Sequence, residues 1–390
     1  MLIYLFINSN ATIDFLQLNL YQMKKLVFPD INIDNLERWT GDVSPLECIL
    51  IKDETHNVKS FTFKSKKDAW FQFFPGQHTT LFLNIDGKDV MRTYTIASSP
   101  TRPNTITITN KRMQDGVVTN WMHDSLKVGD CVEALDIGGS FSVALDQPKP
   151  KILLLSGGSG ITPMLSMSRY FFDLSMDLDL VFIHNAQSEN DLIAKAELDY
   201  YDSTQDNFKR HYVCDVASET WDGASGYLSE KMMVDLVPDF TEREIYCCGP
   251  EPYMQNVKKI LNSCDYDMSL YHQESFDIES STAQNNMAID ADLPEHKVSE
   301  SEINEYNVTL SKSGEVLQCG SNTSILVSIQ KQGITVPFAC SQGLCGTCRT
   351  KMLDGTVEMD AQGGLLKSHE KEGYILTCCS YPTSDIVLDL

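Results

Sequence analysis

The chain has 390 residues, of which 42% are hydrophobic and 22% are charged, and its formal net charge is -23. This length predicts two or three domains, and the composition is that of a globular protein rather than a disordered or fibrous one. The charge argues against nucleic acid and anionic membranes as partners, because both depend on a basic surface.

Residues 1–44 are interpreted as an N-terminal extension. Residues 1–6 are apolar, but polar residues from Asn8 onward interrupt this run well before the length of a membrane span. No basic segment precedes it, as a secretory signal would require, and Met23 could be the true start. We expect a cytoplasmic protein.

The tight grouping of three of the twelve cysteines within 340–348 suits metal binding in a reducing compartment better than disulfides.

Residues 45–147 predict an antiparallel β-barrel. Short alternating segments at 60–64, 79–85 and 105–109 are separated by Pro-Gly, Asp-Gly and Lys-Asp breaks. Several such strands at close spacing are typical of a barrel. A single short helix is expected at 116–125.

A second domain is predicted over residues 148–276. Apolar runs at 152–155, 180–183 and 244–247 alternate with helical stretches such as 163–172. Strands that alternate with helices predict an α/β domain with a parallel sheet.

The segment 277–302 is acidic and polar, with one Lys and no aromatic residue. Because such a segment cannot bury enough surface to order itself, it is interpreted as a flexible acidic linker. The remaining residues, 303–390, are expected to form a small third domain.

The most specific motif lies in this third domain. Cys340, Cys345 and Cys348 follow a C-x4-C-x2-C spacing, and Cys378 lies thirty positions beyond Cys348. Four thiolates in this spacing are typical of a plant-type 2Fe-2S cluster rather than of a zinc ribbon. A zinc site or a set of free thiols is the alternative. Cys379 adjoins Cys378, and adjacent strand positions cannot both face one iron, so we expect Cys378 to be the ligand and Cys379 a core thiol.

The loop around these cysteines contains Gly343 and Gly346, which allow a close approach of backbone amides to the cluster sulfurs. The stretch 307–390, including its last motif at 374–382, resembles plant-type ferredoxins. This resemblance implies a β-grasp fold.

A glycine-rich turn joins a predicted buried strand to a helix in the second domain. It contains Gly157, Gly158, Gly160, Thr162 and Pro163. The helix start offers unpaired N–H groups and a positive dipole to a pyrophosphate, and proline suits the first helical turn. Such turns also occur simply to pack helices on strands, so the turn alone does not identify a ligand.

Two further motifs lie on the predicted barrel. Arg92 could pair with a phosphate, Tyr94 could stack on a flavin ring and Thr95 could bond to it. The amides of the helix that opens at Gly116 could hold a diphosphate. An ordinary β-strand and an ordinary helix cap would give the same patterns.

The order of these motifs, R-x-Y-T, G-x-x-T, GGSGITP and CGP, resembles the ferredoxin reductase superfamily over residues 45–276. The resemblance implies FAD contacts from Arg92, Tyr94, Thr95, Lys111, Gly116, Val118 and Thr119. It places the nicotinamide cofactor along Gly157, Gly158, Gly160, Thr162, Pro163, Cys248, Gly249 and Pro250. Glu274 and Phe276 match the E-x-F that closes such modules, so Cys248 and Glu274 are candidates for positions near the flavin. No catalytic acid, base or nucleophile is assigned.

One position departs from the family pattern. Gln187 stands where members often carry an arginine, and loss of that cation weakens the case for a 2'-phosphate. NADH is therefore favoured over NADPH, unless Lys209 and Arg210 substitute for the missing arginine.

The three modules together indicate an electron-transfer enzyme. Hydride carries two electrons and an iron-sulfur cluster accepts one, so FAD would convert between them. We expect electrons to pass from NADH to FAD, to the 2Fe-2S cluster and then to a partner protein. Among families with this order of modules, the chain looks most like the NADH oxidoreductase that serves the hybrid-cluster protein, and that protein is the expected partner.

Two alternatives stay open. One is the reductase component of a Rieske-type oxygenase, for example one that demethylates glycine betaine. The other, of a different class, is a non-enzymatic ferredoxin-like carrier or redox sensor.

Overall fold

The computed structural model describes residues 37–39, 44–67, 69–145, 148–276, 303–334, 336, 338, 343, 346–361, 364–365 and 367–390. The linker predicted at 277–302 lies outside these residues, as do Cys340 and Cys345. Of residues 1–38, only the two-residue strand β1 (Glu37–Arg38) is described. No helix in the described ranges is long and apolar enough to cross a membrane.

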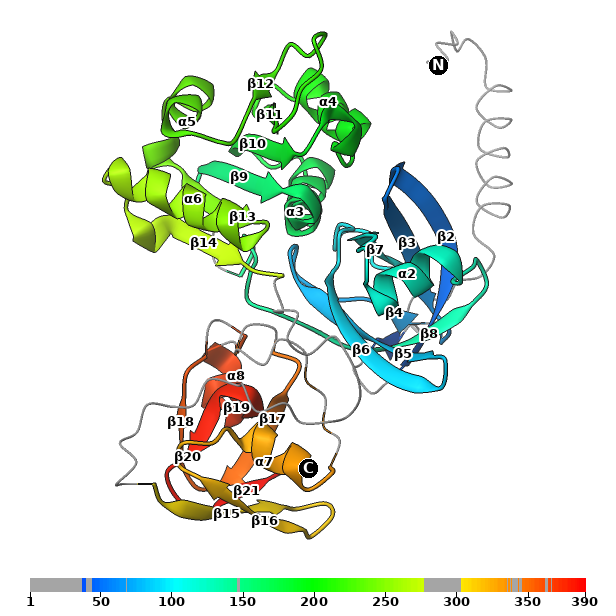
Figure 1. The fold of residues 1–390 in the computed structure, drawn as a ribbon, viewed down its shortest axis with the longest axis vertical. Helices are drawn as coiled ribbons and strands as arrows, with labels where there is room; N and C mark the ends of the chain where they lie inside the picture. The colour runs from blue at the N-terminus through cyan, green and yellow to red at the C-terminus, as the bar shows by residue number, and fades with distance from the viewer. Residues whose placement is uncertain are drawn as a thin grey trace, which may run out of the picture. The chain divides into compact units, whose positions relative to one another are not determined.

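The first domain is built on a six-stranded antiparallel sheet in the order β6-β5-β8-β2-β3-β7 (Figure 1). Its elements are β2 (Ser44–Thr55), β3 (Val58–Ser65), β4 (Ala69–Trp70), β5 (His78–Ile85), β6 (Lys88–Thr95), β7 (Ile106–Lys111), α2 (Val117–Asp124) and β8 (Cys131–Gly138). Alternate strand residues such as Phe61 and Phe63 fill a core to which α2 contributes Val118 and Met122. A bridge between Ile96 and Ile108 links the chain after β6 to β7, so the two edge strands meet. The expected antiparallel domain with one short helix is confirmed.

The second domain has a six-stranded parallel sheet in the order β12-β11-β10-β9-β13-β14. Its strands are β9 (Lys151–Gly157), β10 (Asp179–Ala186), β11 (Phe208–Cys214), β12 (Ala224–Ser225), β13 (Glu244–Cys248) and β14 (Tyr271–Glu274). Its helices are α3 (Ile161–Asp173), α4 (Lys195–Thr204), α5 (Glu230–Leu236) and α6 (Glu251–Ser263).

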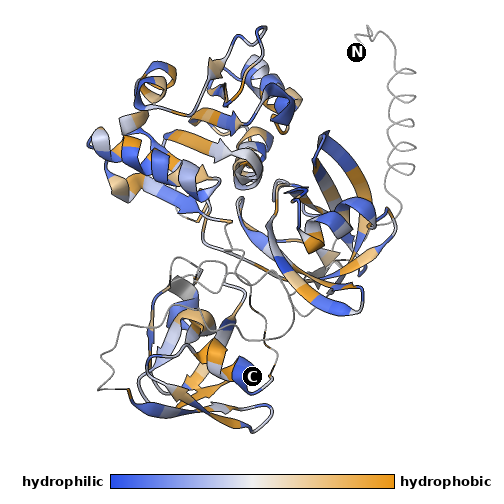
Figure 2. Cartoon of the chain, in the orientation of Figure 1, coloured by the Kyte–Doolittle hydropathy of each residue, from blue (hydrophilic) through white to orange (hydrophobic). Residues whose placement is uncertain are grey.

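Two cores lie on the opposite faces of this parallel sheet, because successive strand residues point to opposite sides. Ile152 and Leu154 of β9 belong to a core shared with α3 and α4, whereas Leu153 and Leu155 belong to a core shared with α5 and α6. The central strands β9 and β10 therefore each contain a run of four apolar residues, 152–155 and 180–183 (Figure 2). The core on the α3 side also includes Val58, Phe141 and Val143 from the first domain and the segment that follows it.

The third domain is a mixed sheet in the order β16-β15-β21-β17-β19, in which only β15 and β21 run parallel. Its elements are β15 (Glu305–Leu310), β16 (Val316–Gly320), α7 (Ile325–Lys331), β17 (Arg349–Asp354), β18 (Val357–Met359), α8 (Lys367–Lys371), β19 (Tyr374–Leu376), β20 (Ser380–Pro382) and β21 (Ile386–Leu388). Ile325 and Ile329 of α7 pack on the sheet core. This arrangement agrees with the predicted β-grasp fold.

Candidate functional site

Two loops meet at the carboxyl edge of the parallel sheet, where β9 leads into α3 and β13 leads into α6. A Cβ atom on Gly160 would lie 2.3 Å from the Cys248 carbonyl oxygen, and one on Gly249 would lie 3.0 Å from the Gly157 nitrogen. The two backbones therefore touch at positions where only glycine fits. Gly158 differs, because its φ of +53° favours glycine while the space around a Cβ is open. The glycines thus pack the loops together and leave the turn itself exposed to a ligand.

The start of α3 follows this turn directly. Its N-cap, Gly160, has no side chain to accept from the first amides, so the helix start carries backbone N–H groups without a side-chain cap. Thr162 is buried and its hydroxyl donates to the Ser159 carbonyl oxygen at 3.3 Å. Pro163 lies in the first turn, where its missing N–H leaves no gap in the helix. The helix begins at Ile161, two residues before the stretch expected from the sequence, and the Ile161 N–H donates to the backbone oxygens of Gly158 and Ser159.

The sequence analysis missed two polar residues, Asn185 and Tyr253, that contact both loops. The Asn185 side chain, at the end of β10, donates to the Ser156 carbonyl oxygen at 3.2 Å and to the Tyr253 hydroxyl at 2.7 Å. The Tyr253 ring lies against the Cα atoms of Gly157 and Gly249. Three strand ends are thereby tied together. The signal for this residue in the sequence was an asparagine placed shortly after the apolar run 180–183, at the carboxyl end of the predicted strand.

The same sheet edge is acidic beside Gln187. Backbone bonds join the Gln187 stretch to the end of β11, where the Asp215 nitrogen donates to the Ala186 oxygen at 3.0 Å. Burial, together with the negative charges of Glu189, Asp215 and Asp191, raises the pKa of the nearby Cys214 thiol to about 11. This environment opposes a 2'-phosphate and suits the uncharged ribose of NADH.

The possibility that Lys209 and Arg210 replace the missing arginine is not supported by the structure. Arg210 pairs with Phe182 in the β10–β11 register, four residues before the carboxyl end at Ala186, which is about 13 Å away. Its guanidinium contacts Asp199 at 2.8 Å, and Lys209 lies 3.9 Å from Asp202. Both cations are therefore paired away from the glycine turn.

Replacing Gln187 by Arg is expected to improve NADPH use. A guanidinium at this exposed position would give a 2'-phosphate a charge-assisted partner, which is worth about 1.5–3 kcal/mol. We expect kcat/KM for NADPH to rise about tenfold or more while kcat/KM for NADH changes little, in steady-state assays with ferricyanide. Gln187→Leu, which lacks the charge, serves as the control; an equal gain in that variant would contradict the argument.

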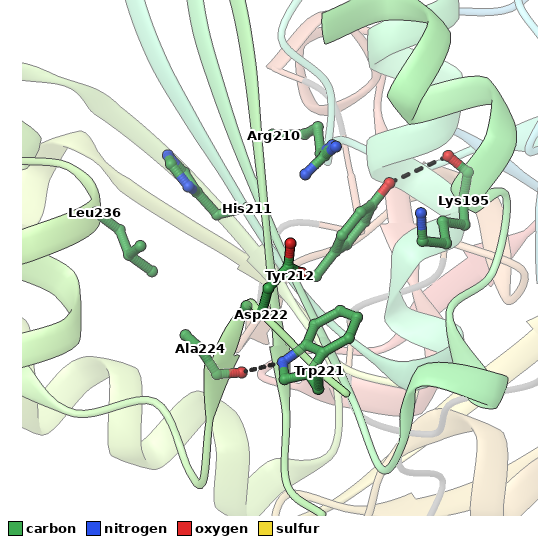
Figure 3. Close-up of a pocket in the computed structure, with 9 residues that line it drawn as sticks. Lys195, Arg210, His211, Tyr212, Trp221, Asp222, Ala224 and Leu236 are labelled. Carbon is green, nitrogen blue, oxygen red and sulfur yellow. Dashed lines mark hydrogen bonds between the residues drawn. The ribbon is translucent and has the colours of Figure 1, made fainter. Parts of the chain in front are cut away.

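A cavity of about 430 Å³ lies beside β11 and β12, lined by aromatic and cationic residues (Figure 3). Tyr212 and Trp221 form part of its wall, but the Lys195 ammonium is 2.6 Å from Asp199 and the Tyr212 hydroxyl donates to the same carboxylate at 2.9 Å. Because none of its residues belongs to the glycine turn, we do not place the cofactor there.

The predicted flavin residues lie at the end of β6. The Arg92 guanidinium donates to the Met91 carbonyl oxygen at 2.7 Å and has no carboxylate partner in the ranges that the structure describes. Tyr94 packs against the domain core, and burial raises the pKa of its hydroxyl well above the usual value. The Thr95 hydroxyl is buried and donates to the Glu274 carboxylate at 3.4 Å. An available cation and a partly exposed ring therefore lie two residues apart on one strand.

The loop before α2 is closed by Thr119. The Thr119 hydroxyl accepts from the Met113 nitrogen at 3.2 Å, and a Cβ on Gly116 would lie 2.3 Å from it. Gly116 caps α2 without a side-chain bond. Val118 points into the core, so only its backbone can face a ligand, while Lys111 ends β7. The first amides of this helix therefore carry no side-chain cap, the arrangement that the predicted diphosphate contact requires.

The carboxyl group of Glu274 lies between the first two domains. It ends β14, its second oxygen lies 3.9 Å from His78 Nδ1, and 15% of its side chain is exposed. Phe276 follows and is 38% exposed. Cys248, the other candidate near the flavin, is fully buried beneath the glycine turn. The structure therefore brings Glu274, rather than the Cys248 thiol, next to the strand that carries Tyr94.

Replacing Glu274 by Gln is expected to stabilise the protein more at pH 8 than at pH 5. Burial raises the pKa of Glu274 to about 8, against the opposing effect of the Thr95 hydrogen bond. Between the ordinary carboxyl pKa and this raised value, the unfolded chain binds fewer protons than the folded one, so the free energy of unfolding falls as pH rises. Thermal unfolding of both proteins at the two pH values measures this. A difference in Tm that does not change with pH would argue against a raised pKa.

The described part of the cluster loop fits a cysteine-held cluster. Gly343 has φ +71°, its N–H donates to Cys378 Sγ at 3.3 Å, and a Cβ on it would lie 2.7 Å from Cys379 Sγ. Gly346 has φ +73° and lies against the Gly364 oxygen. The backbone can therefore approach the two sulfurs at position 343 only because that residue is glycine, while glycine at 346 avoids a clash with the Gly364 oxygen.

The two neighbouring cysteines behave differently. Cys378 and Cys379 lie in a 3-10 turn over Thr377–Cys379, so the strand geometry assumed from the sequence was wrong. Cys378 Sγ accepts from the loop amide, whereas Cys379 Sγ donates to the Leu376 oxygen at 3.7 Å. The Thr377 hydroxyl donates to the Cys348 oxygen at 3.3 Å, which brings the third motif cysteine to the same turn. Both sulfurs lie beside Gly343, and Cys378 is the one that accepts from its amide.

Three family profiles match the chain in the order of its domains. They are an oxidoreductase FAD-binding domain over residues 46–151, an oxidoreductase NAD-binding domain over 154–259 and a 2Fe-2S iron-sulfur cluster binding domain over 308–383. The expected cofactors, FAD, NAD(P)H and a 2Fe-2S cluster, are therefore confirmed at the level of domains.

Three proteins named as reductases or oxidoreductases match this chain over most of their own lengths. The chain is 41% identical over 360 residues to the glycine betaine monooxygenase reductase subunit of Chromohalobacter salexigens, which covers 90% of this chain and 97% of that protein. It is 36% identical to the stachydrine N-demethylase reductase subunit of Rhizobium meliloti, over 89% of this chain and 96% of that protein. It is 26% identical to the NADH oxidoreductase HCR of Escherichia coli, over 82% and 89% respectively.

Solved structures share the three-domain fold. Phthalate dioxygenase reductase, titled as a modular structure for electron transfer from pyridine nucleotides to 2Fe-2S, gives a TM-score of 0.52 at 23% identity and covers 89% of this chain and 98% of that one. An intact type IV self-sufficient cytochrome P450 monooxygenase gives a TM-score of 0.63 at 18% identity, over 89% of this chain and 41% of that one.

Proposed function

Because the chain belongs to the family of FAD- and NAD-binding oxidoreductases that carry a C-terminal 2Fe-2S domain, we propose that it is the reductase component of an oxygenase that demethylates a betaine. The observation that carries the proposal is the 40–41% identity to glycine betaine monooxygenase reductase subunits over nine-tenths of the chain. The stachydrine N-demethylase reductase supports the same class, since both named compounds are quaternary ammonium carboxylates. A cytoplasmic location is part of this proposal.

In the proposed function, each of the three domains would bind one cofactor. FAD, when bound, accepts hydride from a nicotinamide and releases electrons singly. In the proposed site, Arg92 and the amides from Gly116 onward bind the flavin phosphates, while Tyr94 and Thr95 orient its ring. Support for these roles comes from the Arg92 guanidinium, which has no carboxylate partner in the described part of the chain, and from the start of α2, which has no side-chain cap.

The nicotinamide cofactor would lie along the two glycine-supported loops. The exposed Gly158 turn and the start of α3 would bind its pyrophosphate, with Gly249 and Pro250 alongside. The acidic surroundings of Gln187 favour NADH. In the third domain, Cys378 and Cys348, together with Cys340 and Cys345 outside the described residues, would hold the cluster.

Anaerobic electron transfer tests the choice of partner. The NADH-reduced protein would be mixed with a purified glycine betaine oxygenase component and, in parallel, with the hybrid-cluster protein, and the spectrum of each acceptor would be followed. We expect the oxygenase component to be reduced at least tenfold faster. The E. coli NADH oxidoreductase HCR remains a relative at 26% identity, and preferential reduction of the hybrid-cluster protein would overturn the proposal.

A further inference from the structure

The helix α3, which starts at the glycine turn, also bonds to the segment that follows β6. We call β6 the flavin strand, because it carries Arg92, Tyr94 and Thr95 of the proposed flavin site. Ser166 of α3 donates through its hydroxyl to the Ser98 oxygen at 2.7 Å, and the Arg169 guanidinium donates to the Ala97 oxygen at 2.6 Å. Ser98 and Ala97 come directly after β6, which ends at Thr95. One face of α3 is thus bonded to the backbone of the first domain.

Arg169 is itself held in place from the other side. Its guanidinium makes two bonds to the Glu197 carboxylate, at 2.8 and 2.6 Å, and the Tyr201 hydroxyl donates to the same carboxylate at 2.7 Å. Only 14% of the Arg169 side chain is exposed. A planar guanidinium that makes paired bonds to a carboxylate has a fixed direction. The bond to Ala97 is therefore made from a rigid, buried support.

A second contact lies one helical turn further along α3. Asp173 accepts from both nitrogens of Arg102, at 3.0 and 2.6 Å, and from the Thr101 hydroxyl. The Arg102 side chain is 61% exposed, so water screens this pair. The buried bonds from Arg169 and Ser166 therefore hold the segment more firmly than this exposed pair does.

The connections to both cofactor loops are short and stiff. Eight residues of α3, about 12 Å of helix, separate Arg169 from the first helical residue, Ile161. On the other side, only one residue, Ile96, lies between Thr95 and Ala97. A shift of Arg169 relative to Ala97 would therefore be passed on to the distance between the glycine turn and the flavin strand.

We propose that Arg169 is a positioning residue for hydride transfer, which sets the spacing between the nicotinamide-binding turn and the flavin-binding strand by joining α3 to Ala97. The inference rests on the cofactor placement in the proposed function. Reacting atoms must approach to about 3–3.5 Å, and a misplacement of about 1 Å can cost 100-fold in rate. Arg169 acts through the backbone and touches no reacting atom.

Arg169→Lys tests this, because lysine keeps the charge but cannot bond to Ala97 and to both oxygens of Glu197 together. We expect stopped-flow flavin reduction by NADH to slow at least tenfold, with a larger primary isotope effect from NADH deuterated at C4. The dissociation constant for NAD⁺ should stay within about threefold, since the glycine turn is intact. Amide hydrogen exchange in residues 97–102 should become faster.

Arg243→Lys is the matched control. Arg243 is also buried and bonded to two carboxylates, Asp179 and Asp239, but it lies at the amino edge of the sheet and contacts only its own domain. We expect it to lower Tm as much as Arg169→Lys does, while flavin reduction, the isotope effect and exchange in 97–102 stay as in the wild type.

Wild-type flavin reduction in Arg169→Lys, or parallel losses in both variants, would overturn the inference. The assay contains no partner protein, so a wrong choice of oxygenase leaves its result unchanged. Failure of NADH to reduce the wild-type flavin would instead overturn the proposed function.

Discussion

Replacing Cys378 by Ser is expected to remove the 2Fe-2S cluster and to lower electron transfer to a protein acceptor at least 100-fold. Cys378 Sγ accepts from the Gly343 amide and lies at the loop that carries the other motif cysteines. A missing fourth thiolate leaves one iron incompletely held. The oxidation of NADH by ferricyanide needs only the first two domains, so this activity should persist. Iron content and the visible spectrum of the purified variant measure the loss.

Cys379→Ser is the matched control for this change. Its thiol is buried beside Gly343 and donates to the Leu376 oxygen, whereas the Gly343 N–H donates to Cys378 Sγ. Serine can keep that bond, so we expect a full cluster and at most a small fall in Tm. A variant that lacks Cys379 and loses the cluster, while Cys378→Ser retains it, would reverse the ligand assignment.

Replacing Gly160 by Ala is expected to lower NADH-dependent flavin reduction at least 100-fold. The added Cβ would lie 2.3 Å from the Cys248 carbonyl oxygen, and backbone atoms on both sides must move to relieve the clash. Overpacking of this kind costs about 1–3 kcal/mol, and the displaced loops would no longer present the turn and the helix start together. FAD content and reduction by dithionite should be unchanged, because the first domain is untouched. Stopped-flow absorbance measures the rate.

Gly158→Ala separates packing from backbone strain. Nothing lies within 4 Å of a Cβ at this position, and the positive φ alone costs about 1–2 kcal/mol. We expect a much smaller loss of rate than in Gly160→Ala. Equal losses in the two variants would mean that the contact with Cys248 is unimportant.

Local sequence patterns predicted the elements and the loops, because strand alternation and glycine turns act over a few residues. The helix α2 begins one residue after the position expected, and α3 begins at Ile161, two residues before the expected stretch 163–172. The meaning of Gly160 was left open between packing and ligand binding. The structure shows that packing requires it, since its partner is a carbonyl oxygen 88 positions away in the chain.

Contacts between distant residues could not be predicted in the same way. Asn185 and Tyr253 are 68 positions apart, and Arg169 meets Ala97 across 72 positions. Lys209 and Arg210 illustrate the converse error. Their positions in the sequence suggested that they could replace an arginine near Gln187. The register of β10 with β11 shows instead that they lie well back from the carboxyl edge of the sheet.

The core on the α3 side of the parallel sheet has a consequence for how the protein unfolds. Val58, Phe141 and Val143 come from the first domain and the segment after it, yet they are buried among residues of β9, β10 and α3. Separating the two domains would expose this apolar surface to water, at a cost of about 25 cal/mol per Å². The flavin and nicotinamide domains should therefore melt as one cooperative unit, and a cut at residue 147 would destabilise both halves rather than release two independent proteins.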